Sequence, residues 1–417
     1  MYTYGLCGRT LKHSYSKIIH NLLGNELYEL FSLERDSFYE LFESRNFKAV
    51  NVTIPYKKDA LSLCDVVSDK AKAIGSVNTV VNKDGLLCGY NTDYEGFVYM
   101  LKRAKISLEG KKVLILGTGG TSLTANAVAK GENAREIITV SRKGKVDYTN
   151  VYDIADAEVI INTTPVGMYP DNGRAAVDIS RFQKLSGVVD VIYNPLKTEL
   201  LHNAERLGIP CTGGLPMLVA QAVRAHEKFF DVTVPDSVIE IVLFECIESA
   251  LNVVLVGMPG CGKTSVGKKF AKLSDRVFLD TDEFVEQCGM KIPEIFEKFG
   301  EGAFREKETQ ALRMLSALSG KVIATGGGAV LREENIKLMK QNGIIVYVKR
   351  SLDKLSTDGR PLSQGGKEKT ARLYEERHGI YESVSDVCVE TLEDVEGCAE
   401  RLNSLIKQAI PEIFGVK

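Results

Sequence analysis

The stretch Val253-Val-Leu-Val-Gly257-Met-Pro-Gly-Cys-Gly-Lys263-Thr264 decides the fold of the second half of the chain. A short apolar run precedes a complete GxxxxGK[ST] pattern, and the helix-compatible segment 265–271 follows it. A phosphate-binding P-loop requires this order of strand, glycine loop and helix, because backbone N–H groups then converge on phosphate oxygens at a helix N-terminus. The stretch therefore predicts a nucleotide-binding P-loop in a parallel α/β domain.

The residue types in this loop indicate which residues would contact the phosphates and which the metal. Lys263 adds positive charge against the β- and γ-phosphates, and Thr264 offers a hydroxyl to Mg²⁺. The predicted nucleotide contacts are Gly260, Cys261, Gly262, Lys263, Thr264 and Ser265.

Two carboxylates follow the next apolar run, as Asp280-Thr-Asp282. Residues two apart at the end of a strand project on the same side, so one carboxylate can serve the metal and the other a hydroxylated substrate. Without the P-loop, this pattern would more simply be a turn or a helix cap. With the P-loop, we predict a functional pair, with Asp280 beside Thr264 at the metal.

Short β-branched runs alternate with longer amphipathic stretches through the whole chain, which predicts parallel α/β architecture. These runs are 48–54, 112–116, 136–140, 158–162, 187–192, 252–256, 277–280, 322–325 and 343–348. At 417 residues and 45.9 kDa the chain exceeds the size of a single hydrophobic core. Segment 231–250 is expected to be a last helix that runs almost directly into the next strand, so the linker near 245–250 is short.

A second glycine turn, Gly117-Thr-Gly-Gly-Thr121, follows the run 112–116 but has Ser122 where GxGxxG has its third glycine. Alone, this incomplete pattern is weak evidence for a Rossmann-like site. The run 136–140 then ends in Ser141-Arg142-Lys143 and not in an acidic residue. A basic pair suits the 2′-phosphate of NADP, whereas a carboxylate would bind the ribose hydroxyl of NAD. The alternative is that Arg142 and Lys143 are simply solvated loop residues.

Composition excludes several classes of partner. The chain is 44% hydrophobic and 26% charged, with a net charge of −2, so nothing favours nucleic acid or an anionic membrane over small molecules. Nine cysteines without a CxxC pair predict neither a zinc knuckle nor a disulfide framework, and the five histidines have no metal-ligand spacing. With no leader-like start and no long apolar run, we expect a cytoplasmic protein.

Four further motifs follow the P-loop, and in this order they resemble shikimate kinase over about residues 250–410. They are 300–308 with Arg305, Ala324-Thr-Gly326-Gly327-Gly328, Thr357-Asp-Gly-Arg360-Pro-Leu, and 374–381 with Arg377. The resemblance implies a P-loop kinase domain over 250–417 in which Asp282, Arg305, Gly326, Gly327, Gly328 and Arg377 hold shikimate. It also implies that Asp282 accepts the hydroxyl proton and that Arg360 belongs to a lid over ATP.

Motifs in the first half are similar to those of shikimate dehydrogenase, over nearly all of its length. They include 13–21, 50–58, 75–79, 89–96, 162–168, 190–195 and 213–222. The resemblance implies Ser14, Ser16, Thr53, Asn78, Asp93, Tyr193 and Gln221 as substrate contacts. It implies Lys57 and Asp93 as the catalytic pair, and Gly117, Thr118, Gly119, Gly120, Thr121, Ser141, Arg142, Lys143, Val191 and Gly214 as NADP contacts.

Together the two resemblances predict a bifunctional enzyme whose halves treat the same oxygen of one substrate. The first would reduce the 3-keto group of 3-dehydroshikimate with NADPH, and the second would phosphorylate the resulting hydroxyl of shikimate with ATP and Mg²⁺. The expected domains are a substrate lobe, 1–95 plus 215–245, a Rossmann-like NADP lobe, 96–214, and the kinase domain, 250–417. Two alternatives stay open: a dehydrogenase that also accepts quinate, or one half that has lost catalysis and acts as a binding or regulatory module.

Overall fold

The fold is described from a computed structural model that covers residues 2–11, 15–355, 366–391 and 394–416. The chain divides into two compact units, Met1–Cys246 and Ile247–Lys417, and the division falls within the helix α9 (Asp236–Ala250). Only one residue separates α9 from the next strand, β12 (Asn252–Val256), as the sequence predicted. Among the described residues, no helix combines the length and apolar character needed to cross a membrane.

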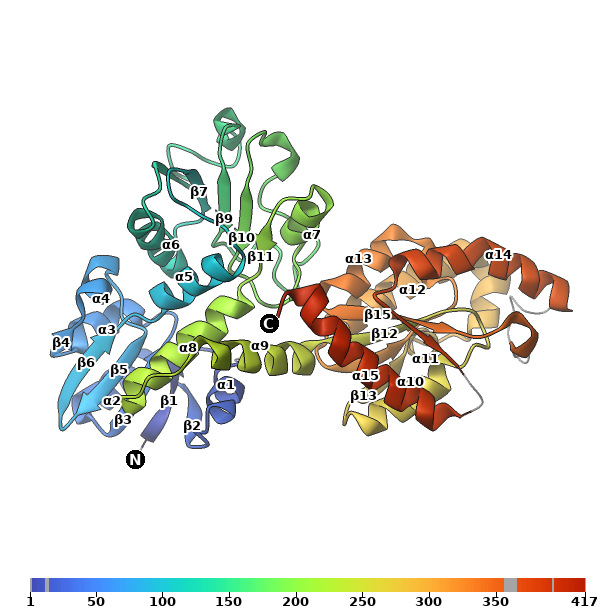
Figure 1. The fold of residues 1–417 in the computed structure, drawn as a ribbon, viewed down its shortest axis with the longest axis horizontal. Coiled ribbons are helices and arrows are strands. Elements are labelled where there is room, and N and C mark those ends of the chain that lie inside the picture. The colour runs from blue at the N-terminus through green and yellow to red at the C-terminus, as the bar shows by residue number, and fades with distance from the viewer. Residues whose placement is uncertain (1, 12–14, 356–365, 392–393, 417) are drawn as a thin grey trace. The chain divides into compact units, whose positions relative to one another are not determined.

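The first unit begins with a six-stranded sheet in the order β2-β1-β3-β5-β6-β4 (Figure 1). Its strands are β1 (Tyr2–Gly8), β2 (Tyr28–Ser32), β3 (Phe47–Val52), β4 (Val66–Val67), β5 (Thr79–Lys83) and β6 (Leu86–Tyr90). The helices along this part of the chain are α1 (Ser16–Leu22), α2 (Arg35–Ser44), α3 (Lys57–Leu63) and α4 (Asp69–Ile74).

This first sheet departs from the parallel arrangement that the sequence predicted, because β5 pairs antiparallel with both β3 and β6. The two residues between β5 and β6, Asp84 and Gly85, have φ angles of 52° and 91°. Positive φ at both positions is what a two-residue hairpin turn needs, and Asp-Gly is a favoured pair for it. The Asp-Gly pair thus indicates a β-hairpin, which the prediction from alternating runs had not included.

A second sheet of the first unit has the order β11-β10-β9-β7-β8, with all its strand pairs parallel. Its strands are β7 (Lys112–Leu116), β8 (Glu136–Val140), β9 (Val159–Asn162), β10 (Gly187–Asp190) and β11 (Cys211–Thr212). The helices α6 (Gly120–Gly131) and α7 (Glu199–Arg206) lie on its two sides (Figure 1), and two short 3₁₀ helices, Val151–Ile154 and Ile179–Arg181, complete the lobe. Parallel strands end at one edge, so the loops after β7, β9 and β10 meet there.

Two helices, α5 (Asp93–Arg103) and α8 (Leu215–Phe230), join the two lobes of the first unit. They pack closely at Gly96, where an added Cβ would lie 2.6 Å from the carbonyl oxygen of Met217 and 2.9 Å from Cβ of Gln221. Glycine is therefore required for this approach of the two helices. Asp93 begins α5 and Gln221 lies on α8, so the same contact sets the spacing between the two helices that carry these polar residues.

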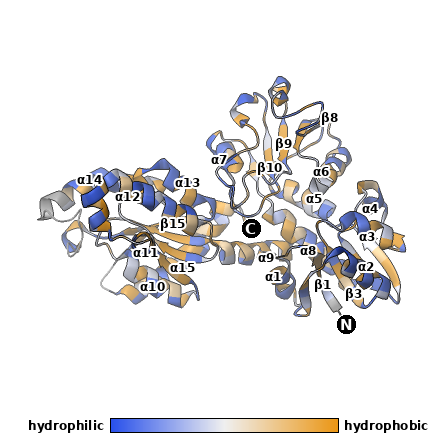
Figure 2. Cartoon of the chain, turned by 180° about the vertical axis from the view of Figure 1, so that it is seen from behind, coloured by the Kyte–Doolittle hydropathy of each residue, from blue (hydrophilic) through white to orange (hydrophobic). Residues whose placement is uncertain are grey.

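The second unit is built on one parallel sheet in the order β13-β14-β12-β15-β16. Its remaining strands are β13 (Val277–Asp280), β14 (Lys321–Ala324), β15 (Gly343–Lys349) and β16 (Val387–Glu390). Its helices are α10 (Lys263–Leu273), α11 (Thr281–Gln287), α12 (Ile292–Ser316), α13 (Glu333–Gln341), α14 (Gly366–Val384) and α15 (Val395–Phe414), with 3₁₀ turns at Ala329–Leu331 and Leu352–Lys354. In Figure 2 the central strands are coloured mostly hydrophobic, as expected for a parallel sheet with both faces covered, and the helices carry both hydrophilic and hydrophobic residues.

Candidate active sites

Lys57 and Asp93 form an ion pair in the first unit. The ammonium Nζ lies 2.6 Å from Oδ2 of the carboxylate, and the two side chains are 23% and 13% exposed. Each residue begins a helix just beyond a strand, Lys57 after β3 and Asp93 after β6. The backbone carbonyl of Lys57 accepts from the N–H of Val77 at 2.9 Å, which anchors this helix start. A partly buried cation is thus held beside a carboxylate that orients it.

Asn78 connects this pair to α8. Its buried amide Nδ2 donates to Thr92 Oγ1 at 3.2 Å and to Gln221 Oε1 at 3.4 Å. Its Oδ1 accepts from the N–H of Thr92 at 2.7 Å. Thr92 is the residue before Asp93, so the structure brings together four side chains that the sequence predicted: Lys57, Asp93, Asn78 and Gln221.

The other predicted substrate contacts lie on three segments of the first unit. Ser16 is buried at the start of α1, and Thr53 donates its N–H to the carbonyl of Cys7 at 2.9 Å. Tyr193, in the loop after β10, meets the ring of Tyr15 edge-on at 5.8 Å, and burial raises the pKa of its hydroxyl. The start of α1 and the loop after β10 are therefore neighbours. Ser14 lies outside the described residues.

The turn after β7 has the geometry of a phosphate cradle. Gly117 has φ of 107°, and an added Cβ would lie 2.9 Å from Thr163 Oγ1. Gly119 and Gly120 have open space where a side chain would stand, and α6 begins at Gly120. Exposed N–H groups at a helix N-terminus suit a pyrophosphate. Ser122, in place of the third glycine, is buried and lies 3.4 Å from Nδ2 of Asn126 on the same helix, which accommodates its hydroxyl.

The remaining cofactor candidates flank this turn. Arg142 and Lys143 are exposed beyond β8, the strand next to β7. On the other side, Val191 and Gly214 approach so closely that a Cβ on Gly214 would lie 2.0 Å from the carbonyl oxygen of Val191. Only glycine fits there. The arrangement leaves the cradle between a basic segment and the loop that carries Tyr193.

In the second unit, the predicted P-loop joins β12 to α10. Three of its glycines have positive φ: Gly257 at 146°, Gly260 at 80° and Gly262 at 103°. Lys263 is buried and donates to the carbonyls of Gly257 at 2.9 Å and Met258 at 3.0 Å. The loop is thus wrapped around its own lysine ammonium, with its backbone N–H groups at the N-terminus of α10.

Thr264 and Asp280 form a pair of oxygen ligands beside this loop. The Thr264 hydroxyl donates to Asp280 Oδ2 at 3.2 Å, and Asp280 Oδ1 accepts from the N–H of Asp282 at 3.0 Å. Asp280 therefore also caps α11, so the structure confirms the helix-cap reading of Asp-x-Asp, and the metal role of Asp280 stays a prediction. A hydroxyl beside a carboxylate suits Mg²⁺, which keeps most of its waters and takes one or two protein oxygens. No cluster of three metal-ligating side chains occurs among the described residues.

A glycine turn after β14 gathers the predicted substrate residues of the second unit. A Cβ on Gly328 would lie 2.3 Å from the guanidinium of Arg305, and one on Gly326 would lie 2.5 Å from Glu308 Oε1 and 2.9 Å from Asp282 Oδ1. The turn therefore has no room for side chains because these three charged groups press against it. Gly327 completes it, packed against Pro259 of the P-loop.

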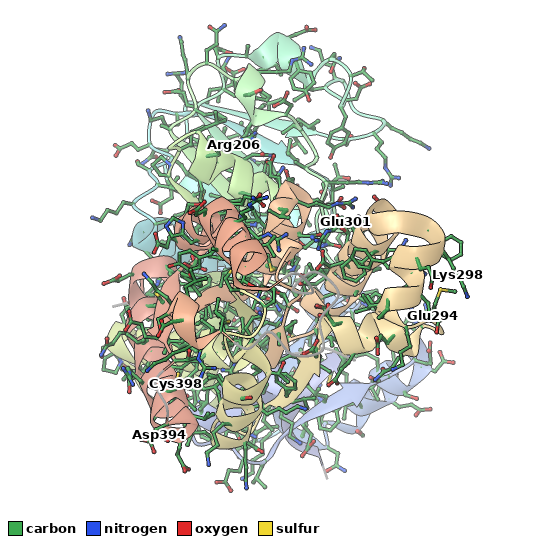
Figure 3. The ribbon with its side chains drawn as sticks, turned by 90° about the vertical axis from the view of Figure 1, so that its right-hand side faces the viewer. Arg206, Glu294, Lys298, Glu301, Asp394 and Cys398 are labelled. Atoms are coloured by element: carbon green, nitrogen blue, oxygen red, sulfur yellow. The ribbon has the colours of Figure 1, made fainter. Side chains whose placement is uncertain are left out.

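Arg305 is buried, and two carboxylates hold it. Its Nη1 donates to Glu308 at 2.8 Å and its Nη2 to Glu301 at 2.9 Å; Glu301 is labelled on α12 in Figure 3. Burial lowers the pKa of Arg305, but Glu308 and Glu301 outweigh it and the net pKa is raised. Burial raises the pKa of Glu308 even though Arg305 opposes the shift. The pair keeps a permanently charged fork aimed at the turn.

Arg377 lies on the other side of the same turn. Its Nη1 donates to the carbonyl of Gly327 at 3.3 Å, and the hydroxyl of Tyr381 donates to the same oxygen. Its Nε is buried and has no partner among the described residues. Sequence reasoning missed Glu308 and Tyr381. The three-residue spacing from Arg305 to Glu308, which places both on one helix face, was a signal for the first.

These groups line a cavity of about 560 Å³. Its walls include Gly260, Gly262, Lys263, Thr264, Ser265, Asp280, Asp282, Arg305, Glu308, Gly326, Gly327, Gly328 and Arg377. Apolar side chains of Ile292, Pro293, Phe296 and Phe304 close one side. Arg360 lies outside the described residues. The cavity thus joins the P-loop, the Thr264–Asp280 pair and the two arginines beside the glycine turn.

Comparison with known proteins agrees with both halves. A family model described as the shikimate dehydrogenase substrate binding domain matches residues 6–80, and one described as shikimate kinase matches residues 259–409. The NADP(+) shikimate dehydrogenase of Clostridium perfringens is 38% identical over 258 residues, which cover 57% of this chain and 95% of that protein.

Solved structures give the same result for the first unit. A chorismate mutase/shikimate 5-dehydrogenase fusion protein from Clostridium acetobutylicum aligns with a TM-score of 0.56 and 32% identity, over 59% of this chain and 97% of the other. Shikimate dehydrogenase 1 from Peptoclostridium difficile aligns with 0.54 and 34%, over 59% and 98%. The chain therefore belongs to the shikimate dehydrogenase family through its first unit and carries a shikimate kinase domain in its second.

Proposed function

We propose that the chain catalyses two consecutive reactions: the NADPH-dependent reduction of 3-dehydroshikimate to shikimate, and the ATP-dependent phosphorylation of the new hydroxyl to give shikimate 3-phosphate. The observation that carries the proposal is that each unit holds the side chains its reaction needs within contact distance. Lys57 lies beside Asp93 in the first unit, and Arg305 lies against the glycine turn beside Asp282 in the second. The proposed order follows from the chemistry, because the first product is the second substrate.

In the first unit, a carbonyl that accepts hydride becomes an alkoxide, which needs a proton. NADPH supplies the hydride, and we assign the proton to the ammonium of Lys57. Asp93, at 2.6 Å, holds and directs that ammonium. Asn78 and Gln221, joined at 3.4 Å, then offer amide groups to the ring hydroxyls of the substrate. Ser14, Ser16, Thr53 and Tyr193 complete the proposed substrate contacts.

For the cofactor, the proposed pyrophosphate contacts are the N–H groups of residues 117–121, and Val191 and Gly214 lie beside the nicotinamide. Arg142 and Lys143 are exposed and carry no acidic neighbour at the end of β8, which favours the 2′-phosphate of NADP. Replacement of Arg142 by Gln tests this assignment. The expected result is a KM for NADPH raised about tenfold or more, with the KM for NADH unchanged.

In the second unit, phosphoryl transfer depends on positioning and on neutralised charge more than on covalent chemistry. Lys263 and the N–H groups of the P-loop would hold the triphosphate, and Thr264 and Asp280 would hold Mg²⁺, which would supply positive charge against the phosphates. Arg305 and Arg377 bind the substrate carboxylate with planar forks. Asp282 accepts the proton of the attacking hydroxyl.

The experiment that tests the proposal uses one purified protein for both reactions. NADPH absorbance is followed with 3-dehydroshikimate, and ADP release is measured after ATP and Mg²⁺ are added to the same tube. Lys57→Met should lower the first kcat by about 10²- to 10⁴-fold and leave the kinase rate with added shikimate unchanged. Asp282→Asn should do the reverse. Loss of both rates from either change would contradict two independent sites.

We also propose that the enzyme works in the cytoplasm. All nine cysteines are free thiols, and five of them are buried. A reducing compartment keeps such thiols reduced, whereas small disulfide-linked folds belong to oxidising ones.

A further inference from the structure

Asp190 is a buried carboxylate that none of the roles proposed above uses. It is the last residue of β10 and has no exposed surface. It stands at the carboxyl edge of the parallel sheet, where dinucleotides bind, directly before Val191 and three residues before Tyr193. Being buried, it acts through its neighbours and not on a ligand.

Three donors surround the carboxylate. Asn162 Nδ2 donates to Oδ1 at 3.0 Å, the N–H of Ile192 donates to Oδ1 at 3.1 Å, and the hydroxyl of Thr198 donates to Oδ2 at 2.7 Å. Within the described residues, no lysine or arginine lies within ion-pair distance of it. Neutral donors alone therefore hold the charge.

Such a group is costly for stability. Burial raises the pKa of Asp190 to about 6, although the hydrogen bonds from Thr198, Ile192 and Asn162 oppose the shift. An apolar side chain of similar volume would fill the site at a lower cost, because no charge would be desolvated. Groups whose pKa is displaced in this way gather at functional sites.

The three donors belong to different segments of the sheet edge. Asn162 ends β9, and its Oδ1 accepts from both the N–H and the hydroxyl of Thr164, at 3.1 Å and 2.7 Å. Thr198 is the N-cap of α7 and accepts from the N–H of Leu201 at 3.4 Å. One carboxylate therefore ties the loop after β9, the loop after β10 and the first turn of α7.

Contacts with Gly214 also restrain the loop after β10. The carbonyl of Val191 stands where Gly214 would carry a Cβ, at 2.0 Å, and the N–H of Gly214 donates to the carbonyl of Ile192 at 2.8 Å. Gly214 is the N-cap of α8, the helix that carries Gln221. A displacement of Ile192 would therefore move Gly214, a proposed cofactor contact, and the start of the helix that carries Gln221, a proposed substrate contact.

We propose that Asp190 is a positioning residue for hydride transfer, which holds Val191 and Tyr193 in register with the nicotinamide and the substrate ring. The inference rests on the proposed function of the first unit. It adds a residue whose effect is on the geometry of the loop after β10, and that effect separates it from residues that bind a ligand directly.

The experiment replaces Asp190 by Asn in the full chain. The side chain keeps its shape, but its amide nitrogen can only donate. Beside Thr198 it forces that hydroxyl, which donates in the wild type, to accept, and beside Ile192 it faces an N–H that has lost its acceptor. The KM for NADPH and the KM for 3-dehydroshikimate should both rise about fivefold to tenfold, and kcat should fall about tenfold, in line with a misplacement of less than 1 Å. The rate of ADP release by the same protein should stay within twofold, which shows that the second unit is unaffected, and an unchanged melting temperature of the first unit shows that this unit is still folded.

Two variants of Thr198 and one control sharpen the result. Thr198→Val removes the hydroxyl and should reproduce the kinetics of Asp190→Asn, whereas Thr198→Ser restores the donor and should return them to within twofold of wild type. Asp178→Asn changes an exposed carboxylate that caps a 3₁₀ helix through Ser180, at 3.0 Å and 2.7 Å, and should leave the kinetics unchanged.

Wild-type constants in Asp190→Asn would overturn the proposal. So would a loss of activity that is matched by an equal loss of melting temperature and is the same in Thr198→Ser and Thr198→Val, because that pattern is purely structural. The wild-type protein is assayed first. If it does not oxidise NADPH, the proposed function fails, and that result is distinct from a failure of the positioning role.

Discussion

Replacement of Gly96 by Ala should damage the dehydrogenase through packing alone. A Cβ at this position would lie 2.6 Å from the Met217 carbonyl oxygen, about 0.8 Å short of the 3.4 Å at which ordinary contact begins. It would also lie 2.9 Å from Cβ of Gln221 and 3.0 Å from its nitrogen. These contacts are with backbone and Cβ atoms, so α5 and α8 must move apart by several tenths of an ångström.

The separation displaces Asp93, three residues earlier on α5, from Gln221 on α8. Misplacement of reacting groups by about 1 Å costs on the order of 10²-fold in rate, so kcat/KM for NADPH oxidation should fall between tenfold and a hundredfold. Overpacking costs about 1–3 kcal/mol, and alanine returns about 1 kcal/mol of helix propensity, so the unit should stay folded. The loss of activity should therefore exceed what unfolding explains.

The assay is NADPH oxidation by the full chain, with ADP release from added shikimate measured on the same sample. Gly379→Ala is the matched control, since Gly379 also lies in a helix but has nothing within 4 Å of the added Cβ. Retention of kcat/KM within threefold in Gly96→Ala would refute the reasoning that this contact sets the Asp93–Gln221 geometry.

Three further perturbations have defined outcomes. Burial, followed by the charge of His226, lowers the pKa of His20 to about 3, so the folded state keeps this ring neutral while the unfolded chain protonates it below about pH 6.5. The free energy of unfolding should therefore fall by about 2 kcal/mol between pH 7 and pH 5. The variant His20→Phe should show a weaker pH dependence in melting curves. Glu308→Gln removes the buried carboxylate from Arg305 and should raise the KM for shikimate about fivefold to tenfold. Glu306 is exposed on the same helix, and Glu306→Gln should leave this KM unchanged. Equal effects of the two changes would exclude a role of Glu308 in orienting Arg305. Tyr381→Phe deletes the hydroxyl that donates to the Gly327 carbonyl, and should lower the unfolding free energy of the second unit by about 1 kcal/mol, as read from urea midpoints; an unchanged midpoint would contradict that contact.

The sequence predicted best what is encoded by neighbouring residues. The P-loop could be recognised because the strand, the glycines with positive φ and Lys263 all lie within twelve residues, and the structure confirms each part. The run 136–140 and its basic end were likewise local, and β8 has the predicted bounds. The short connection between α9 and β12 followed from the same kind of pattern.

Contacts between distant residues were not predictable from local patterns. Lys57 and Asp93 are 36 residues apart, and only the resemblance to a family suggested that they meet. Asp190 was predicted only as a member of the run 187–192 and of the motif 190–195, and its burial could not be predicted because its partner Asn162 lies 28 residues away. Glu308 could not be distinguished from the other charged residues of its helix, because its burial depends on the glycine turn after β14, which is distant in the sequence. Three-dimensional packing decides which of many similar charged side chains become buried.

The capping of α11 by Asp280 has a consequence for how the second unit can evolve. Because one carboxylate touches Thr264 with one oxygen and begins the helix with the other, the spacing between the metal pair and Asp282 is set by a single helical turn. Part of the proposed recognition surface for the rest of the substrate stands on a separate element, α12, which carries Arg305 and the apolar side chains of Ile292, Pro293 and Phe296. Changes on α12 can therefore retarget the enzyme to another hydroxylated acid while the machinery that transfers the phosphoryl group is inherited intact.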